Sequence, residues 1–181
     1  QNPGHRLAVG GAQSLIDRVS GSGEALRSIG IGVPGPVDFA NGTLNVPPIM
    51  PGWERYPIRP KIQETFPHTT VVVDNDVNIM ALGELRAGAG KGVDHFVFVK
   101  VGTGIGAGIV VGGEIYRGST GSAGDIGHIQ ADRNGPVCHC GNIGCLEAMA
   151  SGSALARQAM DAAQSGRSPI LAQYLASGVS P

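Results

Sequence analysis

Three cysteines and a nearby histidine constrain this chain more than any other feature of its sequence. Cys138, Cys140 and Cys145 are its only cysteines, they fall within eight residues, and His128 precedes them. An odd, tight cluster does not suit a secreted disulfide framework, which spreads an even number of cysteines along the chain. Three thiolates and one imidazole are instead the four ligands of a closed tetrahedral zinc site. We therefore predict a structural zinc ion held by these four side chains.

Two alternatives to this metal site stay open. The cysteines could be unpaired and buried without a metal, since free cysteine is among the most buried residue types. His139 lies between two of the predicted ligands and is a competing imidazole. In the zinc interpretation, Gly141 and Gly144 allow the tight turns that bring the sulfurs onto one ion.

The composition excludes several classes of protein. The 181 residues carry 13 basic and 14 acidic side chains, so a net charge of −1 provides no basic surface for nucleic acid. No apolar run approaches the roughly 20 residues that span a bilayer, and no charged-then-apolar leader opens the chain. We expect a soluble, cytoplasmic protein, with the length of one domain or of the joined parts of two small ones.

The pattern of predicted elements is that of an α/β protein. The predicted helices are 12–29 with a following turn, 77–85, 146–160 and 169–176, and the predicted strands are 29–33, 71–73, 95–101 and 109–111. Asn41-Gly42 is typical of a hairpin turn, and residues 46–60, with five prolines, predict an extended loop around Trp53. Strands alternate with helices from residue 29 to 100, which favours an α/β fold with β-hairpins after it.

Polar side chains follow the strand at 71–73. Asn75 and Asp76 lie where the carboxyl ends of strands bind ligands in open α/β sheets. The Asp76 carboxylate could act as a general base on a substrate hydroxyl, or simply accept a hydrogen bond from it. The alternative is that these residues cap the following helix, and the two roles are compatible.

Two further groups of residues are candidates for binding. Residues 102–108 form a glycine-rich turn whose backbone N–H groups could cradle a phosphate, although the pattern fits neither a Rossmann turn nor a P-loop and suits a plain hairpin as well. Asp125 and Glu147 flank the predicted zinc ligands. The metal could hold both carboxylates near one pocket, where they would accept hydrogen bonds from hydroxyls; the alternative is that both are solvated surface acids.

Together these residues resemble the ROK family of repressors, open reading frames and kinases. The similarity is carried by Val101 to His128, by the zinc motif from His128 to Glu147, and by Asp74-Asn75-Asp76. It covers most of the chain from Ile29 to Ala150. The resemblance implies an actin-like ATPase (ribonuclease H-like) fold, in which a hexose binds in a cleft between two α/β domains.

The resemblance also implies roles for single residues. Asn75 and Asp76 would contact sugar hydroxyls, and Asp76 would be the catalytic base in a kinase. Asp125, His128 and Glu147 would hold further hydroxyls, His128 doing so while its other ring nitrogen ligates zinc. The residues expected to face the ATP phosphates are Gly102, Thr103, Gly104 and Gly106. Zinc is the expected structural cofactor, and ATP with Mg²⁺ would be added in a kinase.

Several departures from the family pattern bear on function. No Asp-x-Gly-Gly-Thr phosphate loop occurs before Gly35, so we expect one of the two phosphate-binding segments to be missing, as if the chain began partway into its first domain. On this interpretation residues 1–75 are part of the first α/β lobe, and 76–181 are the second lobe with the zinc knuckle. Asp125 replaces a usual glutamate, and Val46 to Trp53 is apolar, with Ile49 where many kinases place a polar sugar contact.

These departures favour the sugar-responsive regulators of the family. The predicted function is the effector domain of such a regulator, which binds a hexose or amino-hexose, forms a homodimer, and contacts DNA only through a separate N-terminal helix-turn-helix that is not in this chain. No membrane association is expected. The alternative is an ATP-dependent hexose kinase, similar to a glucokinase. A third possibility is a zinc-stabilised α/β fragment with no ligand of its own.

Overall fold

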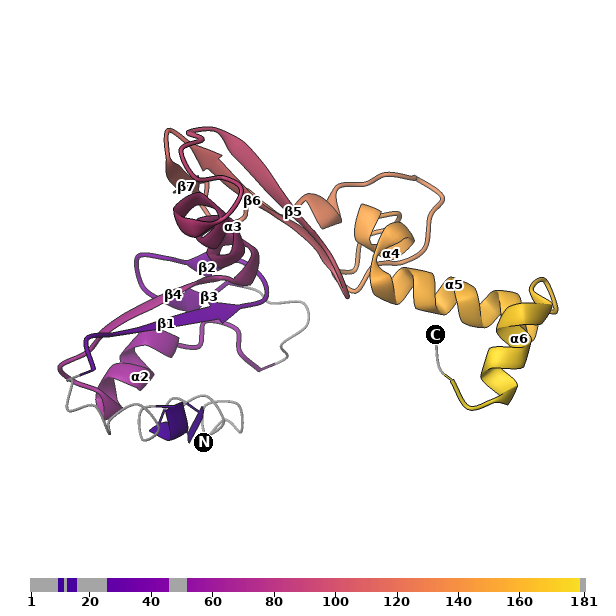
Figure 1. Cartoon of the computed structure of the whole chain (residues 1–181), viewed down its shortest axis with the longest axis horizontal. Helices are drawn as coiled ribbons and strands as arrows, with labels where there is room; N and C mark the ends of the chain where they lie inside the picture. The colour runs from indigo at the N-terminus through magenta and orange to yellow at the C-terminus, as the bar shows by residue number, and fades with distance from the viewer. Residues whose placement is uncertain (1–9, 12, 16–25, 46–51, 180–181) are drawn as a thin grey trace.

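The computed structural model describes residues 10–11, 13–15, 26–45 and 52–179 of the chain. Within these ranges the protein mixes helices and strands, as the predicted α/β class requires. The strands and two helices form one part, from which the C-terminal helices extend (Figure 1). None of the helices in these ranges combines the length and the apolar character that a bilayer-spanning helix needs.

The first sheet pairs two strands that are distant in sequence. β1 (Ser28–Val33) and β4 (Thr70–Asn75) run parallel, with Val33 opposite Asn75, so their carboxyl ends meet at one edge. The helix α2 (Ile58–Thr65) packs on this sheet. The buried core between them consists of Val33, Val37, Leu44, Ile58, Ile62, Val71 and Val73. The strands predicted at 29–33 and 71–73 are confirmed.

A short hairpin connects β1 to the segment that leads to α2. β2 (Val37–Asp38) and β3 (Thr43–Leu44) pair antiparallel. Gly42 lies in the turn with a φ of 65°, in the left-handed region that glycine adopts without strain. The turn predicted at Asn41-Gly42 is therefore confirmed.

The prediction of a proline-rich loop at 46–60 is wrong at the C-terminal end of that range. Residues 46–51, which include Ile49, lie outside the described residues, whereas 58–60 begin α2. Pro57 occupies the N-cap position and Pro60 lies in the first turn. Backbone N–H groups at these positions have no acceptor within the helix, so proline does not oppose helix formation there.

The helix predicted at 12–29 is only partly described. Residues 13–15 are helical, and residues 12 and 16–25 lie outside the described residues. Residues 28 and 29 are the first two of β1. The predicted helix therefore extends too far toward the C-terminus.

The helix α3 (Asp76–Ala87) connects the first sheet to a second one. It begins directly at the end of β4 and contacts β1 and β4 as well as β5 and β6 (Figure 1). The second sheet is antiparallel, in the order β5-β6-β7, with β5 (Phe96–Val101), β6 (Ile105–Val111) and β7 (Glu114–Tyr116). The helix predicted at 77–85 and the strands predicted at 95–101 and 109–111 are confirmed.

The glycine-rich turn before β6 is shorter than predicted. β6 begins at Ile105, so Gly106 and Gly108 belong to a strand. A Cβ atom at Gly108 would lie 2.4 Å from the Cβ of Ala81 and 2.7 Å from the carbonyl oxygen of Val77. These glycines therefore serve the close packing of α3 on β6, which the local sequence does not reveal.

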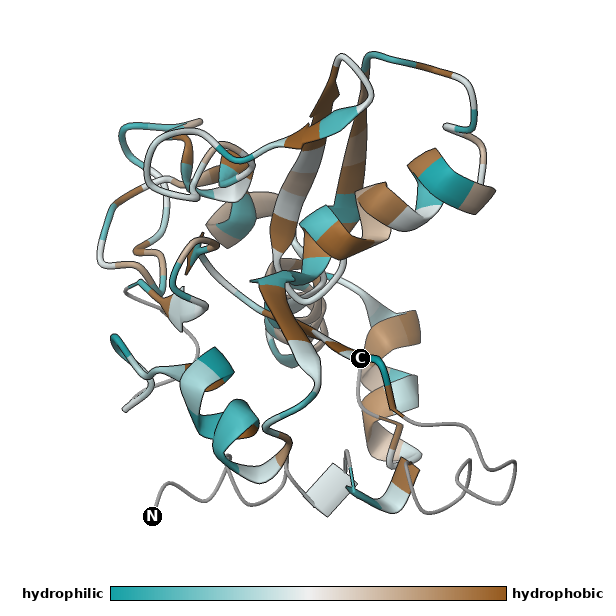
Figure 2. Ribbon diagram, turned by 90° about the vertical axis from the view of Figure 1, so that its left-hand side faces the viewer, coloured by the Kyte–Doolittle hydropathy of each residue, from teal (hydrophilic) through white to brown (hydrophobic). Residues whose placement is uncertain are grey.

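Successive residues of β5 point to opposite faces of the second sheet. Val97, Val99 and Val101 are 58%, 50% and 65% exposed. Figure 2 shows the apolar residues along β5 and β6. Phe96, Phe98 and Lys100 share the other face, which is partly buried on the side of α3.

The single helix predicted at 146–160 is two helices. α4 (Leu146–Ala150) and α5 (Gly152–Gln164) are separated at Ser151. The Ser151 side chain accepts a hydrogen bond from the N–H of Ala154, and the N–H of Gly152 donates to the carbonyl of Gly102 at 2.7 Å. This cap and long-range contact end α4, although the alanine-rich sequence favours a continuous helix.

The last helix has the bounds that the sequence predicts. α6 (Pro169–Ala176) begins with a proline at its first position, and the Ser168 side chain accepts a hydrogen bond from the N–H of Leu171. Both features are typical start signals of a helix. A short 3-10 helix, η2 (Ile126–His128), precedes the cysteine-rich segment.

Replacing Gly108 by alanine is expected to destabilise the fold, because the added methyl group collides with α3. We expect the free energy of unfolding in urea to fall by about 1–3 kcal/mol. Gly30→Ala in β1 is the matched control, since nothing lies within 4 Å of the position that its Cβ would take. Equal losses in the two variants would contradict the close approach of α3 to β6.

Candidate functional site

A cavity of about 230 Å³ lies where the ends of several elements meet. The end of β4 with the start of α3, the turn between β5 and β6, and η2 with α4 all contribute to its lining. The residues predicted to bind sugar are all among the lining residues: Asn75, Asp76, Asp125, His128 and Glu147. The lining runs from Pro34 to Ser153, so segments far apart in the sequence are brought to one place, which makes this cavity the candidate site.

The turn between β5 and β6 contributes mainly backbone to the cavity. Thr103, Gly104 and Gly106, which the sequence predicts to face ATP phosphates, are lining residues. Gly102, predicted with them, is not part of this lining. Its carbonyl accepts the hydrogen bond from Gly152 at the start of α5, so its role here is to join the turn to the C-terminal helices.

Glu147 is held against this turn. Its Oε2 accepts a hydrogen bond from the N–H of Ile105 at 2.8 Å. A Cβ atom at Gly104 would lie 2.5 Å from the same oxygen, so a side chain there would displace the carboxylate. The glycine therefore makes room for the acid.

Asn75 caps α3, as one of the two predicted roles requires. Its Oδ1 accepts hydrogen bonds from the N–H groups of Val77 and Asn78 at 2.9 and 3.3 Å. Its Nδ2 donates to the carbonyl of Gly35 at 3.0 Å. One amide hydrogen is left for a ligand, and the sugar contact of Asn75 stays a prediction.

Asp74, just before these residues, is a buried structural carboxylate. Its Oδ2 accepts from Nε and Nη2 of Arg117 at 3.0 and 2.8 Å. Its Oδ1 accepts from the backbone of Asn75 and the side chain of Asn78. The Arg117 guanidinium also lies 3.8 Å from the centroid of the Phe39 ring. Sequence reasoning missed Arg117, because its partner is 43 residues away and no local pattern connects them.

Asp76, the predicted base, is paired with a lysine that sequence reasoning also missed. Lys100 Nζ lies 2.7 Å from Asp76 Oδ2, and the two side chains are 35% and 26% exposed. Both residues line the cavity. The available signal was the strand period, which places Lys100 on the inner face of an otherwise apolar strand.

Asp125 and Glu147 face the same cavity, so they are not the unrelated surface acids of the alternative interpretation. Asp125 precedes η2 and is partly buried. Burial raises the pKa of the Asp125 carboxyl above its ordinary value; the neighbouring His128 opposes this rise, and the Glu147 carboxylate adds to it. A hydroxyl ligand would therefore meet the Asp125 carboxyl beside Asp76, which is ion-paired, and Glu147, which accepts a hydrogen bond from the backbone.

The predicted zinc ligands come together next to this cavity, since His128 belongs to both. The cluster consists of His128, Cys138, Cys140 and Cys145, and their ligand atoms all lie within 4.8 Å of one another. Cys138 Sγ is 3.6 Å from His128 Nδ1, and Cys140 Sγ is 3.7 Å from Cys145 Sγ. Cys138 and Cys145 are buried. The geometry is that of side chains able to share one ion.

Two glycines shape this segment as predicted. Gly141 and Gly144 have φ angles of 89° and 70°, which residues with side chains rarely adopt. A Cβ atom at Gly144 would also overlap the carbonyl oxygen of Asp132. His139 lines the cavity and is not in the cluster that the described residues form, so His128 is the imidazole of that cluster.

The pKa shifts of the thiols bear on whether a cation can bind to this cluster. Burial raises the pKa of the Cys145 thiol to about 12, and the neighbouring thiols add to the rise. Burial also opposes ionisation of Cys140, but hydrogen bonds involving Asn142 and the other cysteines outweigh it and lower the pKa of this thiol. Several thiolates cannot form so close together unless a positive charge compensates them, and a soft divalent cation has the required chemistry.

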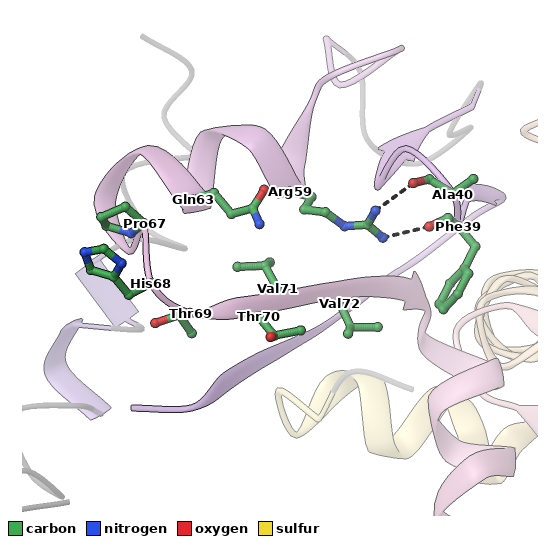
Figure 3. A pocket seen from close by; sticks show the side chains of 10 residues that line it. All are labelled: Phe39, Ala40, Arg59, Gln63, Pro67, His68, Thr69, Thr70, Val71 and Val72. Atoms are coloured by element: carbon green, nitrogen blue, oxygen red, sulfur yellow. Dashed lines mark hydrogen bonds between the residues drawn. The ribbon is translucent and has the colours of Figure 1, made fainter. Parts of the chain in front are cut away.

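A larger cavity, of about 580 Å³, lies between α2 and β4 (Figure 3). Its lining contains no carboxylate or thiol among the described residues. The Arg59 guanidinium at its edge already donates to the carbonyls of Phe39 and Ala40, each at 2.7 Å. The carboxylates that the sequence predicts to bind hydroxyls therefore lie in the smaller cavity and not in this one.

Comparison with known proteins places these features in a family. The model of the ROK family matches residues 8–172. The chain is 46% identical over 132 residues to a putative xylose repressor from Caldicellulosiruptor sp. (strain Rt8B.4). The aligned residues cover 73% of this chain and 33% of the relative. The chain spans between a third and a half of the length of the first curated relatives it matches.

Two solved structures share the fold. A ROK family glucokinase from Streptomyces griseus, in complex with glucose and AMPPNP, is 37% identical, with a TM-score of 0.75, covering 87% of this chain and 49% of that one. A ROK family transcriptional regulator, a homolog of the E. coli MLC protein, is 32% identical, with a TM-score of 0.76, covering 90% and 40%. The actin-like ATPase fold implied by the sequence resemblance is thus supported over the part that this chain spans.

Replacing Arg117 by methionine is expected to weaken the fold, because it leaves the buried Asp74 carboxylate without its cation. Two hydrogen bonds to Asp74 remain, so we expect a loss of about 1–3 kcal/mol in the free energy of unfolding. Lys61→Met breaks an exposed ion pair with Glu64 and should cost less than about 1 kcal/mol. Urea denaturation of both variants measures the difference, and similar losses would contradict a structural role for the Asp74–Arg117 pair.

Proposed function

The chain belongs to the ROK family, and we propose that it is the sugar-binding effector part of a ROK transcriptional regulator. The proposed ligand is a free sugar: a hexose, an amino-hexose or, since one relative is a putative xylose repressor, xylose. Sugar binding would shift the relative closure of the lobes 1–75 and 76–181. A helix-turn-helix outside these 181 residues would read that shift on DNA, and the assembly would be a homodimer.

The observation that carries the proposal is the gathering of three carboxylates around one small cavity. Asp76, Asp125 and Glu147 come from α3, from the segment before η2 and from α4, and all line it. Carboxylates accept hydrogen bonds from hydroxyls, and a few convergent polar groups in a concave site are what fixes the orientation of a small ligand. The side chains of Asn75 and His128 supply donors beside them.

The four clustered cysteine and histidine side chains, we propose, hold a structural zinc ion. Their number, their softness and their mutual distances suit tetrahedral coordination. His128 is part of this cluster and also lines the cavity. A metal at this position would therefore fix the imidazole and the segments that carry Asp125 and Glu147.

The purified chain is expected to contain about one zinc ion per molecule by elemental analysis. Cys145→Ser should remove the metal and lower the thermal midpoint, because a structural zinc ion contributes directly to folding. His139→Gln is the control, since His139 lines the cavity outside the cluster, and it should keep both the metal and the midpoint. Loss of zinc in His139→Gln but not in His128→Gln would contradict the assignment of His128 as the zinc ligand.

The state of Asp76 favours a regulator over a kinase. A general base must accept the proton of the substrate hydroxyl, whereas one of the two carboxylate oxygens of Asp76, Oδ2, is already bonded to the Lys100 ammonium at 2.7 Å, which leaves Oδ1 for a ligand. Asp125, which has a shorter side chain than the glutamate usual in the family, also favours a regulator. The identity of 46% to a putative xylose repressor adds support.

A sugar kinase is the second candidate, because the cavity also contains the turn residues Thr103 and Gly104 beside Asp76. The similar glucokinase from Streptomyces griseus was solved with glucose and AMPPNP. In this function Asp76 would take the proton of a sugar hydroxyl as it attacks the γ-phosphate of Mg-ATP. Catalysis would come from positioning and charge stabilisation.

Calorimetric titration with glucose, xylose and glucosamine, with and without Mg-ATP, tests both candidates. The regulator is expected to bind sugar without nucleotide and to form no sugar phosphate. Asp125→Asn should weaken binding by roughly 10- to 100-fold, because it removes a charged hydrogen-bond acceptor, whereas Asp38→Asn in the β2–β3 hairpin, at a residue that does not line this cavity, should not. Formation of a sugar phosphate that Asp76→Ala abolishes would establish the kinase, and absence of sugar binding would exclude both functions.

A further inference from the structure

Lys100 is a polar residue of the cavity that neither candidate function requires. Among the described residues that line this cavity it is the one lysine, and no arginine lies there. The other five residues of β5 are apolar, so Lys100 is the single charged side chain of this strand. A lysine at this place, next to the predicted catalytic acid, calls for a physical role.

The fold makes space for the Lys100 side chain. Its partner across the strand pair is Gly106, which has no side chain to oppose it. α3 begins on the same side of the sheet with Asp76, and the Lys100 ammonium reaches that carboxylate at 2.7 Å. The lysine is therefore directed along the cavity wall toward Asp76 and the proposed sugar site.

The Asp76–Lys100 pair offers a donor and an acceptor side by side. An ammonium has three N–H donors, and the ion pair uses one of them on Oδ2 of Asp76. The remaining donors of Lys100 and the Oδ1 atom of Asp76 can each serve a ligand. Two neighbouring hydroxyls of a sugar match this arrangement, because one can accept from the ammonium while the other donates to the carboxylate.

The charges around the pair select against an anionic ligand. The Lys100 charge is already matched by Asp76, and Asp125 and Glu147 face the same cavity. Asp125 and Glu147 have no lysine or arginine partner among the described residues of the lining, so a phosphate entering the cavity would meet carboxylates of the same charge at close range, which is unfavourable in a partly desolvated site. A neutral polyhydroxyl compound meets no such penalty.

We propose that Lys100 is a specificity-determining residue that, together with Asp76, recognises a vicinal diol of an unphosphorylated sugar. The inference deepens the proposed function and rests on it, since it names the group of the sugar that is recognised. Lys100 hydrogen-bonds one hydroxyl directly and keeps Asp76 Oδ2 ion-paired, so that Oδ1 is left to accept a hydrogen bond from the neighbouring hydroxyl.

The test is calorimetric titration of the whole chain and of Lys100→Met with glucose, 2-deoxyglucose, 3-deoxyglucose, xylose and glucose 6-phosphate. Wild type should bind glucose or xylose at least tenfold more tightly than Lys100→Met does, and should bind glucose 6-phosphate more weakly than glucose. A deoxy sugar that lacks the recognised hydroxyl should bind wild type and Lys100→Met equally. Lys91→Met, at an exposed lysine, is the control and should match wild type throughout.

Each outcome separates the inference from the proposed function. Equal sugar affinity in wild type and folded Lys100→Met overturns the role of Lys100 and leaves sugar binding intact. Tighter binding of glucose 6-phosphate that depends on Lys100 overturns the neutral-sugar assignment. No binding of any of these sugars to wild type overturns both proposals.

A second variant keeps the test valid if Lys100→Met does not fold. Lys100→Arg retains the positive charge beside Asp76 but presents its donors in a planar fork. It should keep the thermal midpoint of wild type and change the ratio of the affinities for glucose and the deoxy sugars. An unchanged ratio would overturn the proposed recognition of the diol.

Discussion

The buried carboxylate of Asp74 is the interaction on which the geometry of the cavity depends. It joins the last residues of β4, the first turn of α3 and the loop after β7, through Asn75, Asn78 and Arg117. A buried charge is tolerated only where a partner and hydrogen bonds compensate it. Asn75 and Asp76 follow directly in the chain, so their positions are set by a residue that does not itself line the cavity.

The cysteine-rich segment acts on the opposite wall in a comparable way. His128 at the end of η2 and Cys145 before α4 are brought within reach of one ion. The two acids of this wall, Asp125 and Glu147, lie within three residues of these ligands in sequence. One wall is thus organised by an ion pair and the other by a cluster suited to a metal, and the proposed sugar site lies between them.

The parts of the fold that were predictable are those with local signals. The strand at 71–73 ends in polar residues, the helix at 169–176 starts with Ser168 and Pro169, and the metal cluster lies within a short stretch of sequence. The break at Ser151, the packing of Gly108 on α3 and the partners of Asp74 and Asp76 were missed. Each of these depends on a contact with a distant segment, such as Gly152 with Gly102 or Asp74 with Arg117, and no local pattern encodes it.

The hydrogen bonds within the cavity have a consequence for the entropy of association. Asn75 is immobilised by Val77, Asn78 and Gly35, Glu147 by the N–H of Ile105, and Asp76 by Lys100. Restricting a free side chain on complex formation costs about 0.5–1.5 kcal/mol. Folding has already restricted these three side chains, so an incoming molecule binds to a preorganised surface. Most of the entropic penalty therefore belongs to folding and does not reduce the affinity.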